Sequence, residues 1–354
     1  MLLKTVSLVL YEEWPVLHLR KIRLLLGVMT PRKILNFVLI FLSFYWSLWR
    51  KKAFHLGKPL KIGFEPTTSC NLRCPECPSG LRSFTRPTGM AQLEVFKSLI
   101  DQVQKDLIYL LLYFQGEPYL NPDFLAMARY ASERGIYSAT STNGHYLSPE
   151  KARQTVESGL REVIISIDGT TQEVYQQYRV GGNLEKVKQG VRNLVNAREE
   201  AGSLHPFILI QFLVVKHNEH QIEEIQQLGK ELGVDQVVLK TAQIYDYEQG
   251  NPLIPDNPRY SRYKQLSNGR WGIKNELENQ CWKLWHGAEV TWDGKILPCC
   301  FAKDGEFEMG NLQEESFNTI WRSTGYEAFR KQLLRGRAEI EMCKNCSEGT
   351  KVWG

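Results

Sequence analysis

Between Lys61 and Lys240 the chain alternates between short apolar runs and longer segments with helical spacing, and this alternation limits its fold more than any other feature. The apolar runs have the length and continuity of strands that are buried on both faces, and Leu107–Phe114 is the most continuous of them. Strands that alternate with helices form parallel sheets with right-handed crossovers. We therefore predict an α/β fold in which six strand–helix units form a partial (β/α)6 barrel of the TIM type, since about eight units are needed to close one.

The predicted elements follow from these patterns and from their boundary residues. The strands are expected at Lys61–Glu65, Leu107–Phe114, Ile136–Thr142, Glu162–Ile167, Pro206–Val215 and Val234–Lys240. The helices are expected at Gln92–Gln104, Asn121–Arg134, Ser148–Ser158, Asn183–Glu200 and Glu219–Leu232. Functional side chains of such a sheet gather at the carboxyl ends of its strands.

The segment before the barrel is different in character. Met1–Leu10 is apolar but lacks the cleavage site of a signal peptide. Ile34–Trp49 predicts a helix with Thr30 as its cap, about 24 Å long against a hydrocarbon core of ~30 Å. Its few polar residues fall near one face, and basic residues flank both ends. A helix packed on the body, an interfacial anchor beside a membrane and a spanning helix are the three interpretations that the pattern allows, in that order.

The segment after the barrel contains a linker and a second small unit. Residues 245–267 are rich in Pro, Asn and Tyr without clean periodicity. Asp293-Gly294 between two apolar runs predicts a two-residue hairpin turn. Ser316–Leu334 then predicts one amphipathic helix. We expect four parts: an N-terminal helical segment (1–58), the barrel (59–244), a linker or substrate-side loop (245–280) and a C-terminal domain (281–354).

Cysteine placement indicates metal chemistry. Cys70, Cys74 and Cys77 lie within one loop that directly follows the first predicted strand. They are too close to pair comfortably as disulfides and one too few to close a tetrahedral zinc site. Three thiolates suit a [4Fe–4S] cluster with one iron left open. The net charge of +5 is too mild and too dispersed to predict binding of nucleic acid.

The spacing Cys-x3-Cys-x2-Cys resembles the signature of the radical S-adenosylmethionine (SAM) enzymes. The resemblance implies that the open iron chelates the amino and carboxylate groups of SAM and that an electron from the cluster cleaves SAM to a 5′-deoxyadenosyl radical. It also implies a reducing compartment and a low-potential electron donor such as flavodoxin or ferredoxin. Family members usually have an aromatic residue before the third cysteine, where this chain has Glu76.

Further stretches at strand ends match the family in order. Gly116-Glu117-Pro118 resembles the Gly-Glu-Pro motif that holds the SAM amino group in the family, because glycine allows close backbone approach and glutamate accepts hydrogen bonds. Ser166 and Asp168 share one face and are predicted to bind the ribose or the methionine carboxylate. Arg179 is predicted to pair with that carboxylate.

Two later positions complete the expected barrel site. Asn218 follows the fifth strand, where the family usually touches adenine. Lys240, at the end of the sixth, is a candidate base that takes a proton from the substrate. A solvated lysine is the alternative.

A second group of cysteines lies near the C-terminus. Cys281, Cys299, Cys343 and Cys346 resemble the shortened SPASM, or twitch, domain of radical SAM enzymes, which holds an auxiliary [4Fe–4S] cluster. Cys300 competes with Cys299 for one place, and Cys299 is preferred because it follows proline as in the family pattern. A structural zinc ion with four cysteine ligands is the alternative.

These features predict a radical SAM oxidoreductase with SAM and two clusters as cofactors. The expected reaction is dehydrogenation of an alcohol or sugar-like small molecule, with the auxiliary cluster accepting the substrate electron. Radical modification of a peptide side chain is the alternative within the same chemistry. A membrane-surface metal-binding protein without SAM chemistry is the alternative from another class. The expected location is the cytoplasm, with a peripheral contact to the inner face of the membrane through the N-terminal helix.

Overall fold

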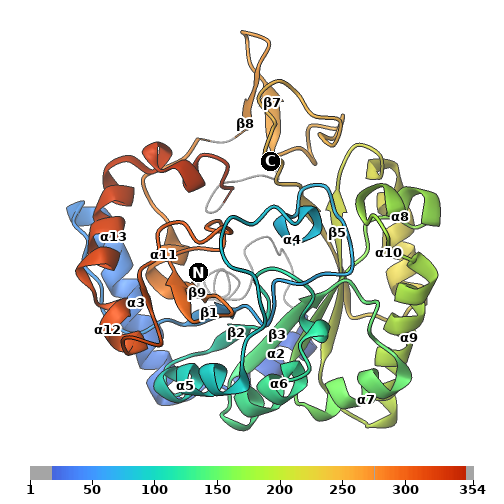
Figure 1. Ribbon diagram of the computed structural model, residues 1–354, viewed down its shortest axis with the longest axis horizontal. Coiled ribbons are helices and arrows are strands. Elements are labelled where there is room, and N and C mark those ends of the chain that lie inside the picture. Colours follow the sequence, from blue (N-terminus) through green and yellow to red (C-terminus); the bar gives the residue numbers. More distant parts are fainter. Residues whose placement is uncertain (1–17, 275, 348–354) are drawn as a thin grey trace.

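The parallel sheet that the sequence predicts forms the centre of the molecule (Figure 1). The computed structural model describes residues 18–274 and 276–347. Its barrel strands are β1 (Lys61–Phe64), β2 (Tyr109–Leu111), β3 (Tyr137–Thr142), β4 (Glu162–Ser166), β5 (Phe207–Val214) and β6 (Gln236–Thr241). They pair in sequence order, and each pair is parallel. The α/β fold and the partial barrel are confirmed.

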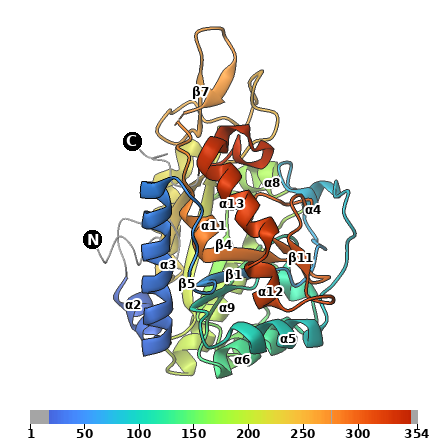
Figure 2. The ribbon, with the colours of Figure 1, turned by 90° about the vertical axis from the view of Figure 1, so that its left-hand side faces the viewer.

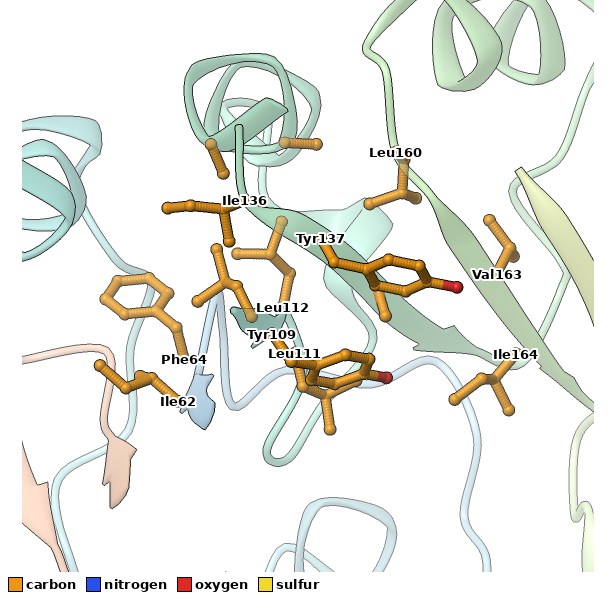
Figure 3. Close-up of a cluster of buried hydrophobic side chains, with 14 of the residues drawn as sticks. Ile62, Phe64, Tyr109, Leu111, Leu112, Ile136, Tyr137, Leu160, Val163 and Ile164 are labelled. Atoms are coloured by element: carbon orange, nitrogen blue, oxygen red, sulfur yellow. The ribbon is translucent and has the colours of Figure 1, made fainter. Parts of the chain in front are cut away.

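Strand β2 is shorter than its apolar run. Regular pairing is limited to three residues, whereas the surrounding positions from Leu107 to Leu112 are all buried. The apolar run therefore predicted the buried residues correctly, but it overestimated the number of residues that pair in β2. The buried cluster drawn in Figure 3 includes Tyr109 and Tyr137, whose rings stack at a centroid distance of 5.5 Å across adjacent strands.

The C-terminal hairpin extends the barrel sheet instead of forming a sheet of its own. Strand β9 (Gly287–Val290) pairs in parallel with β1, and β10 (Lys295–Leu297) and β11 (Gly310–Asn311) continue the sheet in antiparallel fashion. The register places Gly63 opposite Glu289. Cys281 and Cys299, which lie close before β9 and close after β10, therefore lie beside the strand that leads to the first cysteine loop.

The hairpin turn differs from the two-residue turn that we predicted. Thr291 pairs with Lys295, so three residues, Trp292 to Gly294, form the loop. Gly294 has φ +86°, which is typical of a turn that ends in a left-handed residue. The Asp-Gly signal located the hairpin, but the preceding tryptophan joined the loop.

Helices flank the sheet, most of them on its outer face, while the four-residue helix after the cysteine loop lies inside the ring of helices (Figure 1). They are α4 (Pro78–Leu81), α5 (Leu93–Val103), α6 (Phe124–Glu133), α7 (Pro149–Glu157), α8 (Gln172–Tyr178), α9 (Leu184–Glu200), α10 (Ile222–Glu231), α11 (Trp282–His286), α12 (Phe317–Trp321) and α13 (Thr324–Gly336). Short 3₁₀ turns are η1 (Pro118–Leu120), η2 (Glu219–Gln221), η3 (Arg337–Glu339) and η4 (Glu341–Cys343). The single helix predicted at Ser316–Leu334 is broken, because Ser323 caps a new helix with its side chain.

The predicted linker contains a structure of its own. Strands β7 (Tyr263–Gln265) and β8 (Trp271–Ile273) form a two-stranded hairpin that projects from the body (Figure 1). Its turn contains Asn268-Gly269, a hairpin signal of the Asn-Gly kind that the prediction of an irregular linker overlooked.

Two N-terminal helices pack on the body on the side opposite α4 (Figure 2). Helix α2 (Leu19–Leu26) leads into α3 (Pro31–Arg50), which Thr30 caps as expected. Within the described residues, no single helix has both the length and the apolar content needed to cross a bilayer. The pair α2–α3 meets that criterion only when taken together, and it is bent by 105°. Met1–Leu10 lies outside the described residues.

Candidate active site

The first three cysteines lie on the loop that leaves β1. Cys74 is buried, and Cys70 and Cys77 are half-buried. The main chain holds the loop in place, because Arg73 donates its N–H to the carbonyl of Val180 at 2.9 Å. The eight cysteines are all free thiols. The loop therefore presents three thiols at the carboxyl edge of the sheet, as predicted.

Gly116 brings the end of β2 against this loop. Its φ is +73°, and a Cβ atom there would lie 2.2 Å from the carbonyl oxygen of Thr67 and 2.8 Å from that of Ser69. The next residue, Glu117, donates its N–H to that same Ser69 carbonyl at 2.8 Å. Only glycine satisfies both the backbone conformation and the available space.

Glu117 is a buried carboxyl group with several donors. Its Oε1 accepts from the Thr142 hydroxyl at 2.7 Å, and its Oε2 accepts from the Asn143 N–H at 2.8 Å. Burial raises the pKa of Glu117 to about 7, although these hydrogen bonds act in the opposite direction. Asn143 also lies beside the cysteine loop, since its Nδ2 is 3.9 Å from Cys70 Sγ. Glu117 is therefore a hydrogen-bond acceptor with a pKa close to neutral pH, and Asn143 links it to Cys70.

Asp168, which is fully buried, forms an ion pair with the half-buried Arg179 at the end of β4. Arg179 Nε donates to Asp168 Oδ2 at 2.5 Å, and Asp168 Oδ1 accepts from the Leu213 N–H at 2.7 Å. The guanidinium also lies 3.8 Å from Cys74 Sγ. Asp168 therefore positions Arg179 next to the cysteine loop, and Ser166 is buried at the end of the same strand.

Asn218 is engaged in the turn that follows β5. Its Oδ1 accepts from the Val215 N–H, and its Nδ2 donates to the carbonyls of Asp168 and Leu213. Both amide hydrogens are thus used by the main chain. The side chain of Asn218 ties the ends of β4 and β5 together. Its contact with adenine stays a prediction, and the second lone pair of Oδ1 is the acceptor left for it.

The second cysteine group surrounds one cavity. Its lining comprises Cys281, Cys299, Cys343 and Cys346 together with Leu284, Phe301, Phe329, Leu333, Arg337 and Met342. Arg337 donates to Cys346 Sγ at 3.4 Å. Four thiols in an apolar shell with one cation suit the donor set of a fully ligated [4Fe–4S] cube.

Cys300 does not line this cavity. It packs with Phe114, Leu297 and Ala302, and Lys283 Nζ lies 3.4 Å from its sulfur. The thiols of Cys299 and Cys300 interact with each other, and only Cys299 lines the cavity. Among the described residues, no three His, Cys, Asp or Glu side chains are grouped as a single metal ion would require. A cube spreads its thiolates over separate irons and needs no such convergence.

Two residues that the sequence left unexplained connect the two cysteine regions. Glu76, inside the first cysteine loop, accepts from the Tyr245 N–H at 3.0 Å. Lys303 donates from Nζ to the Tyr245 hydroxyl at 2.9 Å and to Gln243 at 3.1 Å. Burial lowers the pKa of Lys303, the neighbouring Cys77 and Cys300 act in the opposite direction, and the charges of Arg262 and Lys240 lower it further. A lone lysine in a turn carries no sequence signal of this position, since most such lysines are solvated.

Sequence reasoning also missed the polar interior beside β9. Glu289 is fully buried and faces Gly63, where a Cβ would collide with its carboxylate. Burial, followed by the charge of Cys300, raises the pKa of Glu289 to about 8. Nearby, Glu65 forms a buried ion pair with Arg86. No pattern at β9 announced the contact between Glu289 and Gly63, because it depends on β9 pairing with β1.

Comparisons with known proteins identify two regions. The model of the Radical SAM superfamily matches residues 64–235. The model of an iron–sulfur cluster-binding domain, SPASM, matches residues 281–347.

Two curated proteins are similar over most of their length. The tungsten-containing aldehyde ferredoxin oxidoreductase cofactor-modifying protein of Pyrococcus furiosus is 29% identical over 80% of this chain and 86% of its own. The AdoMet-dependent heme synthase of Methanosarcina barkeri is 26% identical over 81% of this chain and 91% of its own.

Solved structures share the fold. The structure of Streptococcus suis SuiB bound to precursor peptide SuiA has a TM-score of 0.60 at 14% identity, covering 84% of this chain and 73% of that one. Native anSMEcpe with bound AdoMet has a TM-score of 0.58 at 17% identity, covering 83% and 90%.

Proposed function

We propose a reaction for this chain from the premise that it belongs to the radical SAM superfamily and has a C-terminal SPASM-type domain for an auxiliary [4Fe–4S] cluster. The proposed reaction is the two-electron oxidation of a C–H bond next to a hydroxyl group in a small molecule. When bound, SAM and the two clusters supply a 5′-deoxyadenosyl radical that takes one hydrogen atom and an acceptor for the electron that remains.

The observation that carries this proposal is the cavity with four cysteines. A fully ligated cube has no open iron for a substrate, which leaves electron transfer as its function. The cavity belongs to the wall in which β9 pairs with β1, and β1 leads directly to the first cysteine loop. An electron acceptor held on the same wall as the radical source supports an oxidation.

The residues around the first loop would hold SAM. We propose that Cys70, Cys74 and Cys77 ligate its cluster and that Glu117 accepts hydrogen bonds from the SAM amino group. Arg179, oriented by Asp168, would face the methionine carboxylate as a charge-assisted donor. Gly116 lets the main chain at the end of β2 pack directly against the first loop.

We propose Lys303 in preference to Lys240 as the base that takes the substrate proton at Nζ. Lys303 is tied to Tyr245, whose N–H binds Glu76 of the first loop, and it lies only four residues after Cys299. It therefore stands between the two cysteine regions. Burial favours its neutral form, which a base requires.

A small molecule is the favoured substrate class. The printed names of the two curated relatives refer to a cofactor and to heme, and neither name refers to a peptide. The likeness to peptide-bound SuiB concerns the fold alone. A low-potential flavodoxin or ferredoxin would supply the electron that starts the reaction. We propose a cytoplasmic location at the inner face of the membrane, with α2 and α3 making the contact.

Iron analysis with paired cysteine variants tests the cluster assignment. Anaerobic reconstitution should yield about eight irons per chain and, with dithionite, 5′-deoxyadenosine from SAM. Cys299→Ala should lower the count to about four irons, whereas Cys300→Ala should leave it near eight. Cys74→Ala should abolish SAM cleavage and keep about four. About four irons with tightly held zinc in the unmodified protein would refute the auxiliary cluster.

Deuterium transfer tests the substrate class. Metabolites from cells grown in deuterated medium are separated into small-molecule and peptide fractions and are offered to the loaded enzyme. Deuterium should appear in 5′-deoxyadenosine only with the small-molecule fraction. Deuterium from the peptide fraction alone would favour side-chain modification instead.

A further inference from the structure

Helix α3 packs on the body with its polar side. Its buried positions are Lys33, Asn36, Ile40, Ser43, Phe44 and Ser47, and four of these six are polar. Lys33 Nζ donates to the carbonyl of Gly135 at 2.6 Å, and Asn36 Nδ2 donates to that of Lys58 at 2.9 Å. The helix therefore uses polar groups to satisfy main-chain carbonyls at the body surface.

Charged contacts reinforce this attachment at the amino ends of the strands. Lys21 of α2 forms a buried ion pair with Glu162 at 2.9 Å, at the first residue of β4. Arg32 binds Asp106 at 2.7 Å, close before β2. Together these contacts hold α2 and α3 on the body, so α3 cannot cross a bilayer without losing them.

The opposite side of α3 is apolar and exposed. Every exposed position from residue 34 to residue 49 carries an apolar or aromatic side chain, namely Ile34, Leu35, Val38, Leu42, Tyr45, Trp46 and Trp49. They recur every three or four residues and form one stripe, in which Leu42 is 58% exposed and Trp49 is 75% exposed. Surface helices of water-soluble domains show the reverse orientation, so this stripe requires an apolar partner.

The charge around the stripe indicates the chemistry of that partner. Residues 18–58 contain no Asp or Glu, and Arg23, Arg50, Lys51 and Lys52 are exposed. The three basic residues at the end of α3 directly follow Trp49, and tryptophan beside basic residues is typical of helices that lie in a membrane interface. Two copies of this face would bring like charges together, which disfavours self-association.

We propose that the exposed stripe of α3 binds the surface of an anionic lipid bilayer, with the helix axis in the plane of the interface. The Cys70–Cys77 loop and α4 lie on the far side of the molecule from α3 (Figure 2). Binding in this orientation leaves the mouth of the barrel facing the aqueous phase. The inference does not depend on the reaction catalysed.

Sedimentation with vesicles tests the proposal on the reconstituted full chain. The protein should bind vesicles of phosphatidylcholine with phosphatidylglycerol and should bind phosphatidylcholine alone more weakly. Leu42→Glu should weaken binding at least about tenfold, because a buried leucine side chain is lost from the interface. Arg50→Gln with Lys52→Gln should weaken binding to the anionic vesicles roughly fivefold for each charge.

A matched control separates this effect from general damage. Leu266→Glu changes a leucine that is 40% exposed on the β7–β8 hairpin, and it should leave vesicle binding unchanged. All variants should retain 5′-deoxyadenosine formation with SAM and dithionite, which shows that they fold. Absence of vesicle binding by the unmodified protein, or unchanged binding by Leu42→Glu, would overturn the proposal. So would a dimer in solution that Leu42→Glu converts to a monomer without any vesicle binding.

Discussion

Replacing Glu117 by glutamine should weaken SAM binding without unfolding the site. The glutamine oxygen can accept from the Asn143 N–H, and its NH₂ group can donate to the Thr142 hydroxyl, so the two shortest hydrogen bonds of Glu117 have replacements. Hydrogen bonds to a charged acceptor are worth about 1–2 kcal/mol more than those to a neutral one. We therefore expect the SAM dissociation constant to rise about five- to thirtyfold at pH 8.

The same substitution should remove a pH dependence. Burial raises the pKa of Glu117 to about 7, so the carboxylate that binds SAM best is present above pH 7 and is lost as the pH falls through that value. The carboxylate fraction falls roughly tenfold per pH unit below it. The difference in affinity between the parent enzyme and Glu117→Gln should therefore shrink to about fourfold or less at about pH 6.

Anaerobic calorimetric titration of SAM into the cluster-loaded enzymes measures both effects. The amino group of SAM also titrates, but it does so equally in both proteins, so the ratio of the two dissociation constants isolates Glu117. Glu133→Gln, which changes an exposed glutamate on α6, serves as the control. A ratio that stays constant from acidic to alkaline pH would refute the assignment of Glu117 as the titrating acceptor.

Three further changes test the packing and the proposed base. Gly116→Ala should lower the free energy of unfolding in urea by about 3 kcal/mol or more, because its Cβ would meet a carbonyl oxygen at 2.2 Å. Gly135→Ala, whose Cβ would have nothing within 4 Å, should lower it by about 1 kcal/mol. Equal losses of unfolding free energy would contradict the close approach at Gly116. Lys21→Met should cost about 3–5 kcal/mol at neutral pH, because it leaves the Glu162 carboxylate buried without its partner, and adding Glu162→Gln should restore much of that loss in the same unfolding assay. Lys303→Met should lower substrate oxidation about 10²–10⁴-fold while SAM cleavage without substrate stays about the same, and a parallel loss of both activities would rule out a role limited to proton removal.

The barrel strands were predictable because each is buried on both faces. Such strands leave continuous apolar runs in the sequence, and Ile136–Thr142 and Pro206–Val215 each became a strand within a residue or two of the expected ends. The position of Cys70 followed from the same logic, since loops after parallel strands meet at one edge of the sheet.

Other choices depended on contacts between distant residues. The sequence placed Cys299 and Cys300 side by side, and only the packing of the C-terminal helices shows which of them faces the cavity. Glu76 remained unexplained until Tyr245, far away in sequence, supplied an N–H to its carboxylate. Neither contact has a local periodicity that could announce it.

The sequence by itself determined the parallel barrel, the loop of three cysteines at its edge and the four distal thiols, because burial and ligand spacing are local patterns. The tertiary structure decided that β9 pairs with β1 and so places the distal thiols on the barrel wall. It also decided that α3 turns its polar side to the body and its apolar side outward. Both outcomes depend on which surfaces meet in the folded chain. For α3, hydrogen bonds to the carbonyls of Gly135 and Lys58 fix the polar side against the body, whereas composition alone would have turned its apolar side inward.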